Sequence, residues 1–129
     1  MSFDDGYLRG LPRSYLRLAL LTELAAGPAH GYELLEQVRD LGVRVVDAGG
    51  LYRTLRTMEH DGVVSSWWEP SQSGPPRRTY ELTATGRDAL VGEEVELRST
   101  VGLLTELVER IAAVLPPVTK TTGSTGTAS

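Results

Sequence analysis

The stretch GGLYRTLRTMEHDGVVSSWWEPSQSGPPRRTYELT, residues 49–83, decides the fold that we expect for this chain. The apolar positions of its first part share one helix face: Leu51, Leu55 and Met58. The sequence then becomes β-prone over residues 63–69 and passes through the turn-forming segment PSQSGPP. It returns as a second strand over residues 77–82. The stretch therefore predicts a helix followed by a two-stranded hairpin.

Two further helical patterns precede this stretch. The first opens at residues 11–14 and ends at a Gly-Pro breaker pair at residues 27–28. The second covers about residues 30–41 and carries its own apolar stripe. Short helices followed by a hairpin are the layout of a winged helix-turn-helix domain. We therefore predict a mainly α fold with a β-hairpin wing, in which this domain covers residues 11–83.

A long helix is expected after the wing, over residues 84–115, with Thr83 as its N-cap. Its second half repeats apolar residues at alternating spacings of four and three: Leu97, Val101, Leu104, Val108, Ile111 and Leu115. A period of about 3.5 residues is typical of a helix that packs on a partner helix. We therefore expect a C-terminal dimerisation helix and a homodimer. Residues 116–129, rich in Thr, Gly and Ser after two prolines, are predicted to be a disordered tail.

Composition limits the functions that the chain can have. It has no cysteine, so disulfides and thiolate chemistry are excluded. No apolar run approaches the roughly 18–20 residues of a membrane helix, and the acidic start lacks a signal-peptide pattern, so we expect a cytoplasmic protein without membrane contacts. The formal net charge is −4, so binding to nucleic acid would depend on a local basic surface.

Such a surface is predicted on the helix of residues 49–60. Its polar side chains three and four residues apart lie opposite the apolar stripe: Arg53, Arg56, Thr57 and His60. Guanidinium groups beside hydrogen-bonding side chains suit phosphates and guanine edges in the major groove. Alone, the pattern is equally expected of a solvated helix face. It favours DNA binding because a hairpin follows, with Arg77 and Arg78 placed after its turn.

Catalytic and metal chemistry have little support. The only histidines, His30 and His60, fall on different predicted helices, so a zinc site is not expected without cysteine. The HGY sequence at residues 30–32 is interpreted as a structural helix start. No nucleophile elbow or phosphate-binding loop is present. We therefore predict no enzymatic activity, no cofactor and no metal.

Several spaced motifs resemble the PadR family of transcriptional regulators. They are LLTEL (20–24), PAHGYEL (28–34), GGLYRTLR (49–56), DGVV (61–64) and GPPRRTYELT (74–83) with the following Gly86. The match covers about residues 16–90, and the single last helix is similar to the short-tailed branch. The sequence departs from the family at Gly50, commonly Ser or Thr, and at Arg53, often Pro. The missing hydroxyl at Gly50 removes one expected phosphate contact, which Arg53 could replace.

The resemblance implies a homodimer that sets two recognition helices about one DNA turn (~34 Å) apart on a pseudo-palindromic double-stranded operator. It places Tyr52 near a phosphate, and it implies a repressor that a small-molecule effector releases. We expect the effector between the first and last helices, near the dimer interface. The residues that could line its site are Tyr15, Leu18, Thr22, Leu97 and Val101.

Two other classes of function are alternatives for this sequence. One is a coiled-coil protein-interaction adaptor whose winged-helix domain no longer binds DNA. The other is a small hydrolase, for which the sequence offers no cluster of acid–base groups.

The wing carries adjacent tryptophans, which alternation along a strand places on opposite faces. Trp68 fits an aromatic position common in the PadR wing and is expected to be packed. Trp67 departs from the family and is expected to be either exposed or in contact with a neighbour.

Overall fold

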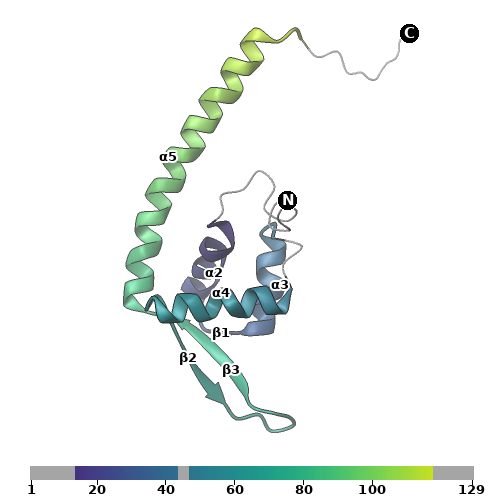
Figure 1. Cartoon of the computed structure of the whole chain (residues 1–129), viewed down its shortest axis with the longest axis vertical. Coiled ribbons are helices and arrows are strands. Elements are labelled where there is room, and N and C mark those ends of the chain that lie inside the picture. The colour runs from purple at the N-terminus through teal and green to yellow at the C-terminus, as the bar shows by residue number, and fades with distance from the viewer. Residues whose placement is uncertain (1–13, 44–46, 118–129) are drawn as a thin grey trace, which may run out of the picture. The chain divides into compact units, whose positions relative to one another are not determined.

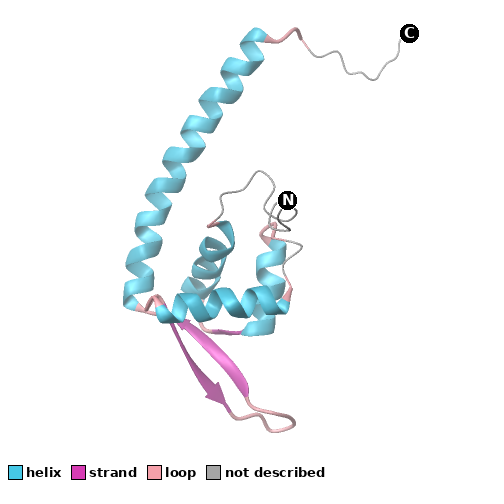
Figure 2. Ribbon diagram, viewed as in Figure 1, coloured by secondary structure: helices cyan, strands magenta, loops and turns pink. Residues whose placement is uncertain are grey.

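The computed structural model describes residues 14–43 and 47–117. The elements follow in the order α2 (Tyr15–Ala26), β1 (Ala29–His30), α3 (Gly31–Asp40), α4 (Ala48–His60), β2 (Val64–Glu69), β3 (Arg77–Leu82) and α5 (Ala84–Val114) (Figure 1). Figure 2 shows the same chain by secondary structure, with the hairpin of β2 and β3 as its long strands. The predicted mainly α fold with a β-hairpin wing is confirmed. The expected helix opening at residues 11–13 and most of the expected tail, residues 118–129, lie outside the described residues.

The chain divides into two compact units, Met1–Glu93 and Glu94–Ser129. The first unit, here called the body, contains α2, α3, α4, the sheet and the first turns of α5. The second unit contains the rest of α5.

Side chains and backbone groups near the helix starts fix where three of the helices begin. The backbone N–H of His30 donates to Glu33 at 2.8 Å at the start of α3. Asp47 accepts from the backbone N–H of Gly50 at 2.8 Å at the start of α4. Thr83 accepts from the backbone N–H of Gly86 at 2.9 Å, so its predicted role as N-cap of α5 is confirmed.

The sheet has the strand order β1-β3-β2 and is antiparallel throughout. In the hairpin, Ser66 is opposite Tyr80 and Trp68 is opposite Arg78. The short strand β1 pairs Ala29 with Tyr80 on the other edge of β3. The sequence did not predict β1, because two residues are too short to show a strand period.

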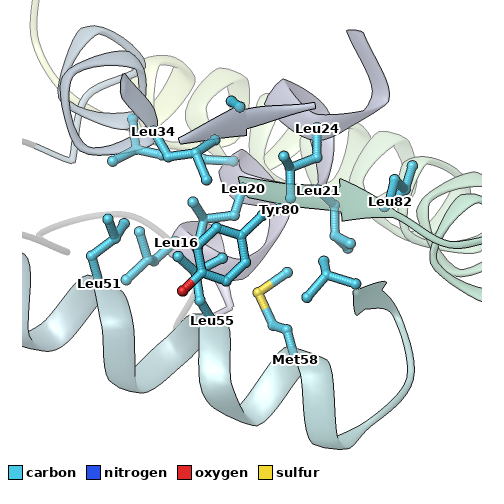
Figure 3. Close-up of a cluster of buried hydrophobic side chains, with 14 of the residues drawn as sticks. Leu16, Leu20, Leu21, Leu24, Leu34, Leu51, Leu55, Met58, Tyr80 and Leu82 are labelled. Carbon is cyan, nitrogen blue, oxygen red and sulfur yellow. The ribbon is translucent and has the colours of Figure 1, made fainter. Parts of the chain in front are cut away.

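The core forms where the apolar faces of α2, α3 and α4 meet the base of the wing (Figure 3). Its fully buried side chains include Leu20, Leu21, Leu34, Leu51, Leu55 and Met58. Tyr80 and Leu82 extend from β3 into the same cluster. Because the wing and α4 share one core, the base of the wing is fixed relative to the exposed face of α4.

The first turn of α5 packs directly on the start of the hairpin. A Cβ atom at Gly86 would lie 2.1 Å from the carbonyl oxygen of Val63, so only glycine allows this approach. The same carbonyl accepts from the backbone N–H of Thr83 at 3.1 Å. The hydroxyl of Thr83 donates to the carbonyl of Gly62 at 2.6 Å.

In the second unit, α5 carries large apolar side chains that are exposed in the single chain: Val95, Val101, Leu103, Leu104, Leu107, Val108, Ile111 and Val114. Leu97 is half-buried. Ion pairs one turn apart, Glu94 with Arg98 and Glu106 with Arg110, lie along the helix. Within the ranges that the structure describes, no helix is both long enough and apolar enough to cross a membrane.

Candidate nucleic-acid interface

Helix α4 has one apolar face and one polar face. Leu51, Leu55 and Met58 are fully buried in the core. The predicted polar group, Arg53, Arg56, Thr57 and His60, is exposed to solvent. The structure therefore brings these four side chains to one accessible face, here called the basic face of α4.

The carboxylates that flank the basic face have partners inside the protein. Asp47 accepts from the backbone of Gly50, Asp61 pairs with Arg17 at 3.2 Å, and Glu59 pairs with Arg78 at 3.7 Å. In contrast, neither Arg53 nor Arg56 forms an ion pair with any residue in the described ranges. A protein with an acidic total charge thus presents unpaired positive charge on this face of α4.

A surface cavity of about 530 Å³ lies between the N-terminus of α3, α4 and the wing. Tyr52 and Arg56 of α4, Tyr32 of α3, and Trp68 and Arg77 of the wing are among the residues that line it. Arg77 donates to the hydroxyl of Tyr32 at 3.4 Å. The cavity therefore combines aromatic rings and guanidinium groups, which suit a sugar-phosphate backbone.

Gly31 leaves the space in which the end of the Tyr52 side chain lies. A Cβ atom at Gly31 would lie 2.3 Å from the Tyr52 hydroxyl oxygen and 2.5 Å from its ring. The tyrosine therefore crosses the first turn of α3 at a distance that only glycine permits. Sequence reasoning named Tyr52 but missed Tyr32 and the role of Gly31, although the HGY motif was the available signal.

The expectation for the tryptophans was wrong at Trp68, which is 61% exposed and therefore more exposed than Trp67 at 38%. The reason is that Trp68 faces a charged side chain rather than the core. The guanidinium carbon of Arg78 lies 5.2 Å from the centre of the Trp68 ring, a cation–π contact.

His30 has neighbours that fit a structural role. Its Nδ1 lies 3.1 Å from the hydroxyl oxygen of Thr79, and that hydroxyl donates to Glu69 at 2.9 Å. These contacts join β1 to both strands of the wing. Within the part of the chain that the structure describes, no group of three or more His, Asp or Glu residues could hold a metal ion.

Among the ionisable groups of the described residues, Tyr80 is the one whose pKa is clearly shifted. Burial raises the pKa of its phenol above the ordinary value, and the nearby positive charge of Arg78 opposes this shift. The phenol is therefore neutral around neutral pH and lies beside the cavity as a hydrogen-bond donor.

The residues expected to bind an effector are divided between the two units. Tyr15, Leu18 and Thr22 belong to α2, where Leu18 is buried and the Thr22 hydroxyl donates to the Leu18 carbonyl at 2.8 Å. Leu97 and Val101 belong to the second unit. The effector site therefore stays a prediction.

The packing of α2, α3 and α4 against an antiparallel wing defines a winged helix-turn-helix protein. Solved structures share this architecture. A PadR family transcription regulator from Clostridium difficile R20291 is 27% identical, with a TM-score of 0.67 over 73% of this chain and 98% of that one. A PadR family transcriptional regulator from Eggerthella lenta is also 27% identical, with a TM-score of 0.62 over 74% of this chain and 85% of that one. A search of curated proteins found no match.

The family model of the PadR-like transcriptional regulators matches residues 18–91. The chain belongs to this family, as its motifs predicted, and it is a DNA-binding transcriptional regulator.

Proposed function

We propose that this protein is a homodimeric repressor that binds a pseudo-palindromic operator through α4 and the wing. The observation that carries the proposal is the basic face of α4, where Arg53 and Arg56 are exposed and have no carboxylate partner among the described residues. Bidentate guanidinium contacts to guanine are the commonest specific contact in the major groove.

The roles of the side chains follow from their positions. Arg56 lies on α4 and lines the cavity, so we assign it to a base edge. Arg77 lies where β3 leaves the wing turn and bonds only to the neutral Tyr32 hydroxyl in the described ranges, so we assign it to a phosphate. Tyr52 lines the same cavity as these two arginines, so we assign its hydroxyl to the DNA backbone as a hydrogen-bond donor.

The proposed dimer uses the apolar stripe of α5. Leu104, Val108 and Ile111 are exposed in the single chain and recur at a period of about 3.5 residues. An apolar stripe of this length is typical of an interface, since water contact with it is unfavourable.

The test of DNA binding begins with selection of bound sequences from random DNA by the purified protein, which yields the operator. We expect Arg56→Ala to weaken operator binding by roughly 1–3 kcal/mol and to relax preference at one base position. Arg98→Ala is the matched control, because it removes the same charge from α5. If the wild-type protein enriches no sequence, the protein-interaction adaptor becomes the better proposal.

The test of the dimer replaces Leu104 and Val108 together by glutamate, which should give a monomer by light scattering. The control replaces Ser99 and Leu103 by glutamate, because these residues lie off the stripe and Leu103 is just as exposed. A Leu104/Val108 variant that remains a dimer would place the interface elsewhere.

The regulatory part of the proposal is that an effector releases the operator. An effector acts only if it binds the DNA-competent and released states with different affinity. Effector and operator should then weaken each other by the same factor. Titration of a candidate ligand against the free and DNA-bound protein measures both factors, and Leu97→Trp should change the response if the predicted site is right.

A further inference from the structure

The C-terminal end of α4 is joined to the wing by a group of contacts that the sequence did not predict. The Ser66 hydroxyl donates to Glu59 Oε2 at 2.9 Å, and Arg78 Nε donates to Ser66 Oγ at 3.0 Å. Arg78 Nη2 lies 3.7 Å from Glu59 Oε1, which closes the triangle. The Trp68 ring covers the Arg78 guanidinium at 5.2 Å. These four residues, Glu59, Ser66, Trp68 and Arg78, are here called the clasp.

The register of the hairpin explains why the clasp forms. Ser66 and Trp68 are two residues apart on β2 and therefore share one face of the sheet. Arg78 is the cross-strand partner of Trp68, so it lies on that face too. Glu59 reaches this face from α4, one residue before the end of that helix.

Glu59 places a negative charge beside the surface that is proposed to bind DNA. A carboxylate beside the basic face of α4 repels DNA phosphates, so it costs affinity unless it has another role. Its oxygens are both used within the clasp. Arg78 is likewise engaged on three sides, whereas Arg77 has only the neutral Tyr32 hydroxyl as a partner in the described ranges.

We propose that Glu59 and Arg78 are positioning residues: they fix the wing at a set angle to α4, and Arg78 acts on DNA through this geometry rather than by binding a phosphate. This inference rests on the proposed function, in which α4 and the wing contact one operator together. The sequence alone predicts Arg78 as a direct DNA contact, beside Arg77. The adjacent arginines of the wing thus have different roles. Arg77 binds a DNA phosphate, whereas Arg78 holds the wing against α4.

The sharpest test removes the negative charge. Glu59→Ala would strengthen DNA binding if Glu59 only repelled phosphates, but we expect it to weaken operator binding by roughly threefold to thirtyfold. Glu81→Ala is the matched control, because Glu81 is an exposed carboxylate of β3 outside the clasp. The control should bind as the wild type does or slightly more tightly. Tighter binding by Glu59→Ala would overturn the inference.

Salt dependence separates the two arginines. Arg77→Ala should reduce the slope of log affinity against log salt by about 0.9, because one phosphate contact is lost. Arg78→Ala should weaken binding but leave that slope unchanged. The double variant Glu59→Ala/Arg78→Ala should bind the operator no more weakly than either single variant, since each substitution removes the same linkage between α4 and the wing. A flattened slope for Arg78→Ala would make it a phosphate contact instead.

A readout without DNA keeps this inference separate from the proposed function. The chain has only two tryptophans, both on β2, so a Trp67→Phe background leaves Trp68 as the only tryptophan reporter. Adding Glu59→Ala should increase acrylamide quenching of Trp68, as Arg78→Ala should, while Glu81→Ala should not. If quenching of Trp68 rises in the Glu59→Ala variant but the wild type binds no operator, the clasp is supported and the proposed function is wrong. If the operator binds and quenching is unchanged, the clasp is wrong.

Discussion

Leu55 and Leu104 belong to apolar helix stripes of similar spacing, yet they have opposite surroundings. Leu55 is fully buried in the body, whereas Leu104 in the second unit is 53% exposed. In the body, the stripes of α2, α3 and α4 cover one another and the base of the wing. In the second unit, the stripe residues Leu104, Val108 and Ile111 are exposed in the part of the chain that the structure describes. A helical repeat therefore indicates that a face will be buried, but not whether the same chain buries it.

The largest expected effect separates these two leucines. Leu55→Ala should lower the free energy of unfolding by about 2–5 kcal/mol at any protein concentration, because it leaves a cavity in the core. Leu104→Ala should lower stability at high concentration and have little effect after dilution below the dimer dissociation constant. Urea unfolding at widely separated protein concentrations measures both. Equal losses at all concentrations would mean that Leu104 packs within its own chain.

A smaller effect, of opposite sign in the two regions, is expected for glycines of the same helix. Gly86→Ala should destabilise the body by roughly 1–3 kcal/mol, because the new methyl group would meet the Val63 carbonyl. Gly102→Ala meets nothing within 4 Å and should stabilise α5 by about 0.5–1 kcal/mol through helix propensity. Thermal unfolding followed by circular dichroism compares them. A destabilising Gly102→Ala would reveal that a dimer partner approaches α5 closely there.

The smallest effect concerns surface ion pairs. Arg17 and Asp61 connect α2 to the end of α4 at 3.2 Å, whereas Glu94 and Arg98 lie one turn apart at 2.8 Å on α5. Partly exposed pairs of either kind contribute about 0–1 kcal/mol, and salt screens them. Double-mutant cycles at low and high salt should give a small coupling for each pair that falls as salt rises. A coupling well above 1 kcal/mol for Arg17 and Asp61 would show that this ion pair between helices contributes more to the free energy of unfolding than its exposure indicates.

The structural features that could be predicted from the sequence are those that depend on local periodicity. The helix faces of α4, the strands of the wing and the Thr83 cap were all readable because each involves residues a few positions apart. The outward direction of Arg53 and Arg56 followed from the same period.

Contacts between distant segments were not predictable in this way. Glu59 and Arg78 are joined only once the hairpin folds onto α4, so their pairing has no local signature. The error at Trp68 has the same origin, since its neighbour across the strand is an arginine rather than the core. The closeness of Gly31 and Tyr52 depends on how α3 and α4 cross, although the glycine in the HGY motif was a hint.

The junction at Thr83, where β3 ends and α5 begins, has a mechanical consequence. The Val63 carbonyl receives the backbone N–H of Thr83 and faces Gly86 with no space for even a methyl group. The base of the hairpin and the first turn of α5 therefore move together as one rigid unit. A torque applied to the first turn of α5 is not absorbed at this junction and is transmitted to the base of the hairpin. The junction thus couples the first turn of α5 rigidly to the base of the hairpin, which the core and the clasp hold against α4.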